Sequence, residues 1–265
     1  GDIAEELRRL RETGLERGWY SPIEAVYALG LAILTAHARR AGQSIDAETA
    51  KTALWLASFG VQRVIHPLAV DVVIELLRPL RDHYWSGWAS LLDTAANVEI
   101  TDLVLEELKE IYGHASNLED WAKAYLAYAY ARAGDEERAC SLLDNMKDDV
   151  LRILTGAYVY YILASTGVSC RNTDPCKGLE DINQRLEKLR EEASNPREFL
   201  KNHPGLEEYL RWRGVGKPEE VLNVVIRDAH ASALSGLGHC ALDRGELGKA
   251  ADYFSEVAKI AHELG

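Results

Sequence analysis

An all-α fold is predicted from three observations. Apolar residues recur every three or four positions along most of the chain, as they do on one face of an α-helix, and the strict alternation typical of strands is absent. The segments 21–24 (Ser-Pro-Ile-Glu) and 195–198 (Asn-Pro-Arg-Glu) each combine a capping side chain, a proline and a glutamate that can reach back to the cap. Glycines stand where the helical patterns stop, as helix C-caps require. They are Gly42, Gly134, Gly167, Gly245 and Gly265.

The apolar periodicity places helices along nearly the whole chain. Between 179 and 194, for example, Leu179, Ile182, Leu186 and Leu189 form one stripe with charged residues between them. Proline, glycine and polar residues near 168–178 and 203–216 predict irregular loops there, and the remainder is expected to form one α-helical domain over 1–265. The predicted helices cover 2–17, 22–41, 46–64, 67–95, 101–114, 118–133, 136–146, 148–166, 179–194, 196–202, 218–244 and 247–264.

The net charge of −12 limits the classes of partner. An acidic surface repels phosphate backbones and anionic lipid headgroups, so binding to nucleic acid or to a membrane surface is not expected. The more natural electrostatic match is another protein or a peptide of basic character.

Targeting and membrane-spanning segments are also not expected. The first residues lack a basic region followed by an apolar one. The longest uncharged run, 153–170, contains threonine, serine, glycine and three tyrosines, which favours a buried helix over a membrane span. We therefore expect a soluble, cytoplasmic protein.

Four cysteines are too few for a disulfide framework in a chain of this length. Cys170 and Cys176 flank the turn-rich stretch 171–175, so these two could close a small disulfide ring; reduced thiols are the alternative. A single methionine and few glutamines suggest a hyperthermophile, in which intracellular disulfides occur.

A repeat-like pattern is clearest at 231–258. Gly238 and Ala250 are small where two helices would cross closely, Phe254 is large enough to fill the space beside them, and Gly245 supplies the turn. A second match covers 120–146, with Ala127 before the turn at Gly134 and Leu143 after it. Both segments resemble the tetratricopeptide repeat, although strict 34-residue units are not present.

The resemblance implies a right-handed α-α superhelix of antiparallel helix hairpins, a divergent solenoid; a compact helical domain without repeats is the alternative. It also implies a partner-binding groove lined by the first helix of each hairpin. In that groove Trp121 and Tyr128 would be rigid anchors, and Arg132 could pair with a partner carboxylate. Each groove residue could instead pack against a neighbouring helix. The remaining groove positions are Ser232, Ser235 and His239.

The most unusual local feature is an aromatic cluster, Tyr84, Trp85 and Trp88. On one continuous helix Trp85 and Trp88 would share a face, with Tyr84 one turn from Trp88. Such a cluster is typical of a sticky ligand- or peptide-binding patch, or of a core between helices.

Motifs for catalysis, metals and cofactors are not found. No two of the eight histidines have zinc-protease spacing, and the cysteines lack the close pairs of a zinc site. The stretch 214–217 (Gly-Val-Gly-Lys) lacks the first glycine and the hydroxyl residue of a phosphate-binding loop. No catalytic residue, metal or cofactor is therefore predicted.

The expected function is that of a protein-protein interaction scaffold or adaptor, and the chain is not expected to be an enzyme. The alternative is a helical enzyme or small-ligand binder that uses an aromatic-lined interior pocket between Trp55 and Tyr161. A third possibility is an obligate oligomer that buries the face of Trp85.

Overall fold

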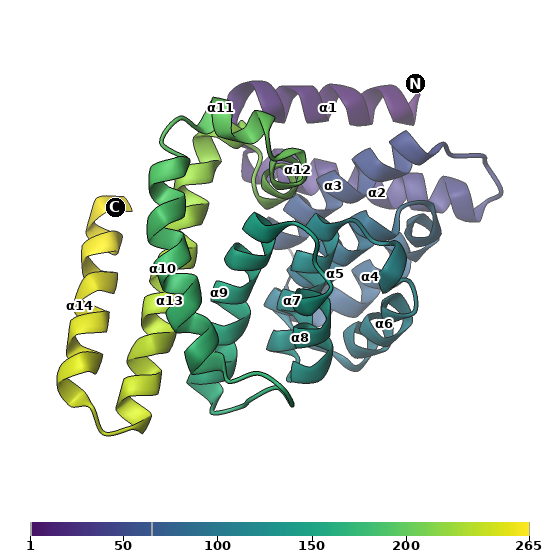
Figure 1. Cartoon of the computed structure of the whole chain (residues 1–265). Coiled ribbons are helices and arrows are strands. Elements are labelled where there is room, and N and C mark those ends of the chain that lie inside the picture. The colour runs from purple at the N-terminus through teal and green to yellow at the C-terminus, as the bar shows by residue number, and fades with distance from the viewer. Residues whose placement is uncertain (1, 65, 265) are drawn as a thin grey trace. The chain divides into compact units, whose positions relative to one another are not determined.

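The protein is all-helical, as predicted. The computed structural model describes residues 2–64 and 66–264, and in these ranges the chain forms α- and 3₁₀-helices joined by turns, with no β-sheet (Figure 1). The chain divides into two compact units. Unit 1 comprises Gly1–Ala129 and Arg211–Lys217, and unit 2 comprises Tyr130–Leu210 and Pro218–Gly265. The sequence had predicted one continuous array, and the two units are described separately.

Unit 1 begins with three long helices and continues with shorter ones. They are α1 (Ile3–Arg17), α2 (Pro22–Arg40), α3 (Ala47–Val64), η1 (Pro67–Ala69), α4 (Val70–Leu77), η2 (Arg78–His83), α5 (Trp85–Val98), α6 (Asp102–Tyr112), η3 (Ala115–Asn117) and most of α7 (Asp120–Arg132). Helix α3 forms the centre of the unit, because α1, α2 and α5 all pack against it. Its residues Leu54 and Leu56 are fully buried.

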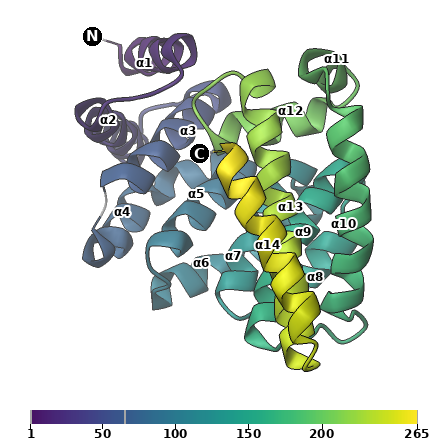
Figure 2. The same ribbon diagram turned by 90° about the vertical axis from the view of Figure 1, so that its left-hand side faces the viewer.

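Unit 2 is built around its longest helix, α13. Helices α9, α10 and α14 pack against α13, as Figure 2 shows for the C-terminal part of the chain. The helices of the unit are α8 (Glu136–Asp144), α9 (Asp149–Thr166), α10 (Pro175–Glu192), α11 (Pro196–Lys201), most of α12 (Pro204–Arg213), α13 (Pro218–Asp243) and α14 (Leu247–Leu264).

The predicted helix starts and stops are confirmed in detail. The Ser21 side chain accepts a hydrogen bond from the Glu24 amide, and the Glu24 carboxylate accepts one from the Ser21 amide. Asn195 caps α11 in the same way through the amide of Glu198. Four of the predicted terminating glycines, Gly42, Gly134, Gly167 and Gly245, have positive φ, a conformation that glycine adopts without a steric penalty. Gly265 lies outside the described residues.

Three predicted boundaries are wrong, each at a proline. The helix predicted over 67–95 is interrupted by η2, because Pro79 lacks the amide hydrogen that a continuous α-helix needs. Tyr84, between η2 and α5, has a non-helical φ of −158°. The loops predicted at 168–178 and 203–216 are shorter than expected. Pro175 and Pro204 instead occupy the first position of α10 and α12, where the missing hydrogen has no consequence.

The contact predicted between Gly238 and Phe254 is confirmed. A methyl group added at Gly238 on α13 would lie 2.6 Å from the Phe254 ring on α14. Gly245 turns the chain between these two helices with φ of 73°. The hairpin therefore depends on a residue without a side chain at position 238.

The predicted disulfide between Cys170 and Cys176 is wrong. Cys140 pairs with Cys170 and Cys176 pairs with Cys240, with Cα–Cα distances of 6.5 Å and 6.0 Å. Because α10 begins at Pro175, Cys176 lies on a helix that packs against α13, which carries Cys240. The bridges connect residues 30 and 64 positions apart, so each restricts a long loop of the unfolded chain and stabilises the fold by about 4 kcal/mol.

The close approach of α2 to α3 can be tested at Gly60. We expect Gly60→Ala to lower the free energy of unfolding by about 1–3 kcal/mol, because the new methyl group would lie 2.8 Å from Leu29 Cβ and 3.0 Å from the Ala25 carbonyl oxygen. Gly248→Ala is the control, since no atom lies within 4 Å of its added methyl group. Denaturant unfolding with the disulfides intact measures both, and equal effects would contradict close packing at Gly60.

Candidate functional site

Helix α2 presents an apolar face to solvent. Ile23, Val26, Tyr27 and Leu34 are 82%, 56%, 46% and 53% exposed. They recur at steps of three, one and seven residues, so they lie on one side of the helix, with the exposed Gly30 at the centre. We refer to these five residues as the outer face of α2. In Figure 2 the helix lies at an edge of unit 1.

The opposite side of α2 consists largely of small residues. Ala25, Ala28, Ala32 and Ala36 are fully buried. The backbone of α2 comes so close to α3 that Gly60 has no room for a methyl group. Leu31 is the one large apolar side chain buried on this side, and four other large apolar side chains of α2 face solvent, which is unusual for a surface helix.

Charge is confined to the two ends of α2. Glu24 lies in the first turn and His37, Arg39 and Arg40 lie in the last turn, and residues 25–36 carry no charge. Glu24 pairs with Arg17, which holds the N-terminal end against α1. Because acids near the N-terminus and bases near the C-terminus both complement the helix dipole, these charges stabilise α2 without interrupting its apolar face.

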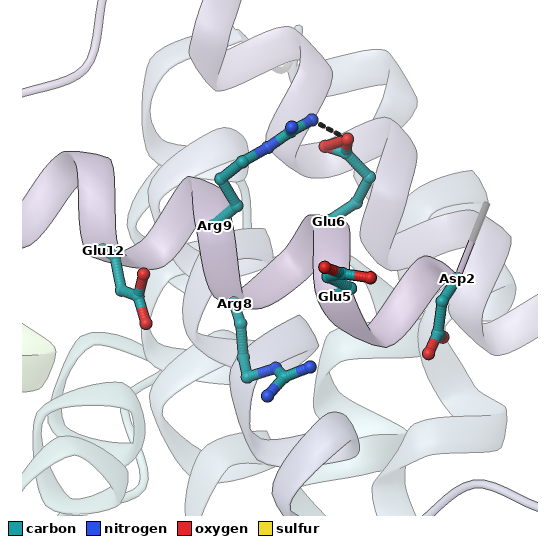
Figure 3. Close-up of a pocket in the computed structure, with 6 residues that line it drawn as sticks. All are labelled: Asp2, Glu5, Glu6, Arg8, Arg9 and Glu12. Atoms are coloured by element: carbon teal, nitrogen blue, oxygen red, sulfur yellow. Dashed lines mark hydrogen bonds and ion pairs between the residues drawn. The ribbon is translucent and has the colours of Figure 1, made fainter.

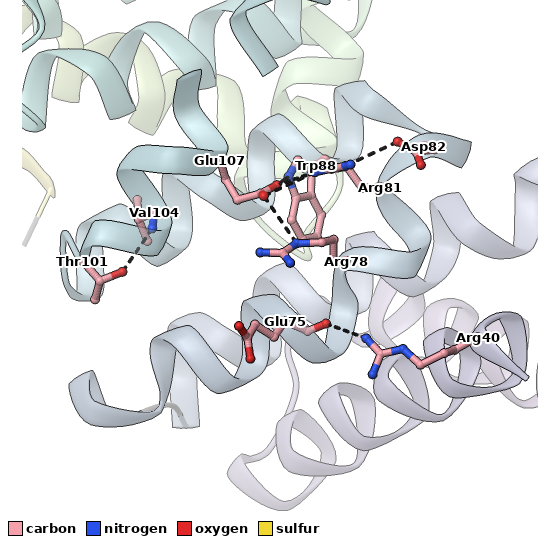
Figure 4. A network of polar contacts seen from close by, with 9 residues as sticks. All are labelled: Arg40, Glu75, Arg78, Arg81, Asp82, Trp88, Thr101, Val104 and Glu107. Carbon is pink, nitrogen blue, oxygen red and sulfur yellow. Dashed lines mark hydrogen bonds and ion pairs between the residues drawn. The ribbon is translucent and has the colours of Figure 1, made fainter. Parts of the chain in front are cut away.

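The short helix η1 and helix α4, of which α4 packs against α2, together carry a smaller set of exposed apolar residues. Leu68, Val72 and Leu76 are 88%, 57% and 37% exposed at intervals of four residues. The Arg40 guanidinium donates a hydrogen bond to the Glu75 carbonyl oxygen and ties the two helices together (Figure 4).

The predicted aromatic cluster does not form a single patch. Trp88 is fully buried, which agrees with the core alternative, whereas Trp85 is half-buried and stacks on His114 at 3.9 Å. Tyr84 precedes α5 and lies against the rings of Trp121 and Trp212. The face of Trp85 is thus partly covered by unit 1 itself.

A buried acid connects the helices around Trp88 (Figure 4). Glu107 on α6 is 5% exposed and accepts hydrogen bonds from Arg81 Nη1 at 3.1 Å and from Trp88 Nε1 at 3.0 Å. Arg78 forms an additional ion pair with Glu107 at 3.4 Å. Two cations and an indole compensate the buried carboxylate, so this network serves to hold η2, α5 and α6 together.

Of the six predicted groove residues, Trp121 and Tyr128 are buried and the other four are half-buried. In unit 1 Trp121 and Tyr128 are 2% and 3% exposed, and Trp121 stacks on Trp212 at 5.0 Å. In unit 2 the Arg132 guanidinium lies over the ring of Tyr158, and His239 contacts the rings of Tyr161 and Phe254. Ser232 and Ser235 on α13 are partly exposed. Trp121 and Tyr128 therefore pack against neighbouring helices, which was the alternative to a position in the groove.

The described residues of unit 1 include an aromatic-lined hollow and a charged one. One has a volume of about 190 Å³ and is bounded by aromatic residues, two arginines and the loop after α12. Its lining includes Trp19, Tyr20, Phe59, Arg63 and Arg213. The other consists of six charged residues along α1 alone, and Figure 3 shows their side chains spread along a single helix with no second element opposite. The second region is therefore a solvated helix surface.

His230 is the one buried histidine of unit 2 among the described residues. It lies on α13, is 6% exposed, and its two ring nitrogens have no hydrogen-bond partner there. Burial lowers the pKa of His230, and Arg190 lowers it further, whereas Glu187, Glu256 and Glu263 raise it. The neutral imidazole is therefore favoured in the folded state.

Clustered metal ligands and membrane spans were also sought. The described residues contain no group of three or more histidine, cysteine or acidic side chains able to hold a metal ion. Within the same ranges no helix has both the length and the apolarity needed to cross a bilayer.

No protein-family model, curated protein or solved structure matches the chain. The candidate site is therefore identified from geometry alone, and the outer face of α2 is its strongest feature.

We expect Glu107→Gln to lower the free energy of unfolding by about 2–4 kcal/mol, because Arg78 and Arg81 would lose their buried counter-charge. Glu106→Gln, one residue away on the exposed side of α6, is the matched control and should change it by less than about 0.5 kcal/mol. Urea unfolding measures both variants, and equal losses would show that the network does not stabilise the fold.

Because the pKa of His230 is lowered in the folded state, we expect the free energy of unfolding to depend on pH. Since the folded-state pKa is below the unfolded value of 6.5, the unfolded chain binds the proton first, and stability should fall as the pH is lowered below about 6.5. His230→Leu should reduce this loss, whereas His262→Leu, at an exposed position on α14, should leave it unchanged. Unfolding at several pH values between neutral and mildly acidic tests this, and identical slopes for all three proteins would contradict it.

Proposed function

We propose that the protein is an interaction scaffold or adaptor that binds another polypeptide chain through the outer face of α2. The observation that supports this proposal is the solvent-facing surface formed by the five uncharged residues of the outer face of α2. Contiguous exposed apolar patches of several hundred Å² mark interaction sites in soluble proteins.

The packing of α2 suggests why an apolar surface of this helix faces solvent. A helix that only covered the core would turn its larger apolar residues inward, where each buried side chain stabilises the fold by about 1.5–3 kcal/mol. Here alanines occupy most of the inward positions, with Leu31 as the one large apolar residue among them, and Ile23, Val26, Tyr27 and Leu34 face outward. Contact with a second apolar surface would recover the burial that these four side chains lack in the folded chain.

The chemistry of the partner follows from the same surface. Because residues 25–36 are uncharged, the complementary surface is an apolar helix face, of the kind that meets another helix at i, i+3, i+4 and i+7 positions.

Small-ligand binding is the second candidate. The cavity beside Trp19, Tyr20 and Phe59 supports it through aromatic walls and through Arg63 and Arg213, which suit an anionic group. Its volume of about 190 Å³ is smaller than the 300–1,000 Å³ typical of ligand sites. The outer face of α2 is therefore the stronger feature.

The tetratricopeptide-like superhelix remains part of the proposal. The contact of Gly238 with Phe254 and the positive φ of Gly245 support it for the α13–α14 hairpin. We also propose a cytoplasmic location. In that compartment the two disulfides would fit a hyperthermophile, since intracellular disulfides are otherwise rare.

The proposed function is tested by capture of bound chains from an extract of the source cells. Tagged wild-type protein should retain at least one polypeptide that Val26→Lys/Leu34→Lys does not retain, because two charges on the outer face oppose its burial. Leu242→Lys/Leu247→Lys is the matched control, since both residues are exposed in unit 2 and the charge change is the same. If the α2 variant captured everything that the wild type captures, this site would not be the binding surface.

A further inference from the structure

We infer that the polypeptide bound by the outer face of α2 is a second copy of this chain, with the two α2 helices antiparallel and crossing at Gly30. This inference rests on the proposed function, because it names the partner of the same surface. Gly30, the distribution of side chains around it, and the charges at the helix ends support it.

Gly30 is the first feature. It lies in the interior of α2, where glycine costs roughly 0.5–1 kcal/mol relative to alanine. In the folded chain nothing requires this glycine, because no atom lies within 4 Å of an added methyl group. A second helix packed against the outer face would require it, since a residue without a side chain allows two backbones to approach closely.

The second feature is the symmetric spacing of apolar residues about Gly30. Val26 and Leu34 of the outer face lie four residues to either side of it, and Tyr27 and the half-buried Ile33, which borders the outer face, lie three residues to either side. A two-fold axis at Gly30 therefore places Val26 opposite the partner's Leu34, and Tyr27 opposite the partner's Ile33. Such self-complementarity is what an interface between identical subunits requires.

The third feature is the charge at the helix ends, which selects the direction of the pair. Glu24 is in the first turn of α2 and three basic residues, His37, Arg39 and Arg40, are in the last. An antiparallel pair places the basic end of each helix near the acidic end of the other and opposes the two helix dipoles. A parallel pair would bring six basic residues together.

Area is the remaining requirement. A stable dimer buries about 800 Å² on each partner, more than one helix face usually supplies. The neighbouring segment offers Leu68 on η1, and Val72 and Leu76 on α4, as additional exposed apolar surface. We expect these residues to extend the interface beyond α2.

Cysteine cross-linking tests the arrangement. All four native cysteines are paired in disulfides, so an introduced cysteine supplies the free thiol. Under oxidising conditions Gly30→Cys should form a covalent dimer, because position 30 lies at the two-fold axis. Ile23→Cys alone should remain a single chain, whereas Ile23→Cys/His37→Cys should cross-link, since these positions face each other in an antiparallel pair. Leu247→Cys, at an exposed site in unit 2, is the control.

The variant Gly30→Leu distinguishes close packing of two α2 helices from non-specific association of apolar surfaces. The substitution adds apolar surface to an open position and improves helix propensity, so a non-specific patch would associate more strongly. In the inferred dimer the leucine would fill the space needed by the partner helix, and the dissociation constant measured by sedimentation should rise about tenfold. Stronger association of Gly30→Leu, or cross-linking of Ile23→Cys by itself, would overturn the inference.

The identity of the chain captured by wild-type protein distinguishes this inference from the proposed function. If the wild type captures an untagged copy of the same chain and Val26→Lys/Leu34→Lys does not, both the inference and the proposed function are supported. The wild type could instead sediment as a monomer and capture a different protein that Val26→Lys/Leu34→Lys does not capture. This result would overturn the inference of a second copy but support the proposed function. If the wild type floated with lipid vesicles and Val26→Lys/Leu34→Lys did not, the outer face would bind membranes, and both the inference and the proposed function would be overturned.

Discussion

The contact between α2 and α3 is the constraint on which the account of unit 1 depends. Fully buried alanines of α2 and the glycine at position 60 of α3 bring the two backbones together, to the point where one added methyl group would meet Leu29 and the Ala25 carbonyl oxygen. Close packing of this kind leaves little room for larger side chains where α2 meets α3, and Leu31 is the one large apolar side chain buried on that side. Ile23, Val26, Tyr27 and Leu34 face solvent instead, and they form the candidate site.

The same use of small residues organises unit 2. Gly238 allows α14 to lie against α13, with the Phe254 ring in the space that a side chain would occupy. The disulfide between Cys176 and Cys240 connects α10 to α13, so the central helix is fixed on that side by a covalent bond as well as by packing. His230 lies buried on the same helix, which makes its protonation a cost to this unit.

Local signals in the sequence predicted the helices but not the surfaces they present. Caps such as Ser21 and Asn195, and glycines such as Gly245, act within one turn and can be identified without knowledge of the fold. Pro175 and Pro204 were misassigned because proline is typical both of loops and of first helical positions. Disulfide pairing depends on which helices pack together, so proximity in sequence gave the wrong partner for Cys176. The outer face of α2 was missed because apolar residues occur on every side of residues 25–36, and only the packing on α3 shows which side is covered.

Hydroxyl-radical footprinting of the wild-type protein tests most directly whether the outer face of α2 is a contact surface. Oxidation of Tyr27 and Leu34 should be slow in concentrated solution and should accelerate on dilution, as the assembly dissociates and exposes them. Leu247, exposed on a different unit, should react at one rate throughout. The outer face of α2 would not be a contact surface if Tyr27 and Leu34 were oxidised at rates that do not depend on concentration. Those rates would also have to be as fast as the exposure of the two residues in the single chain implies.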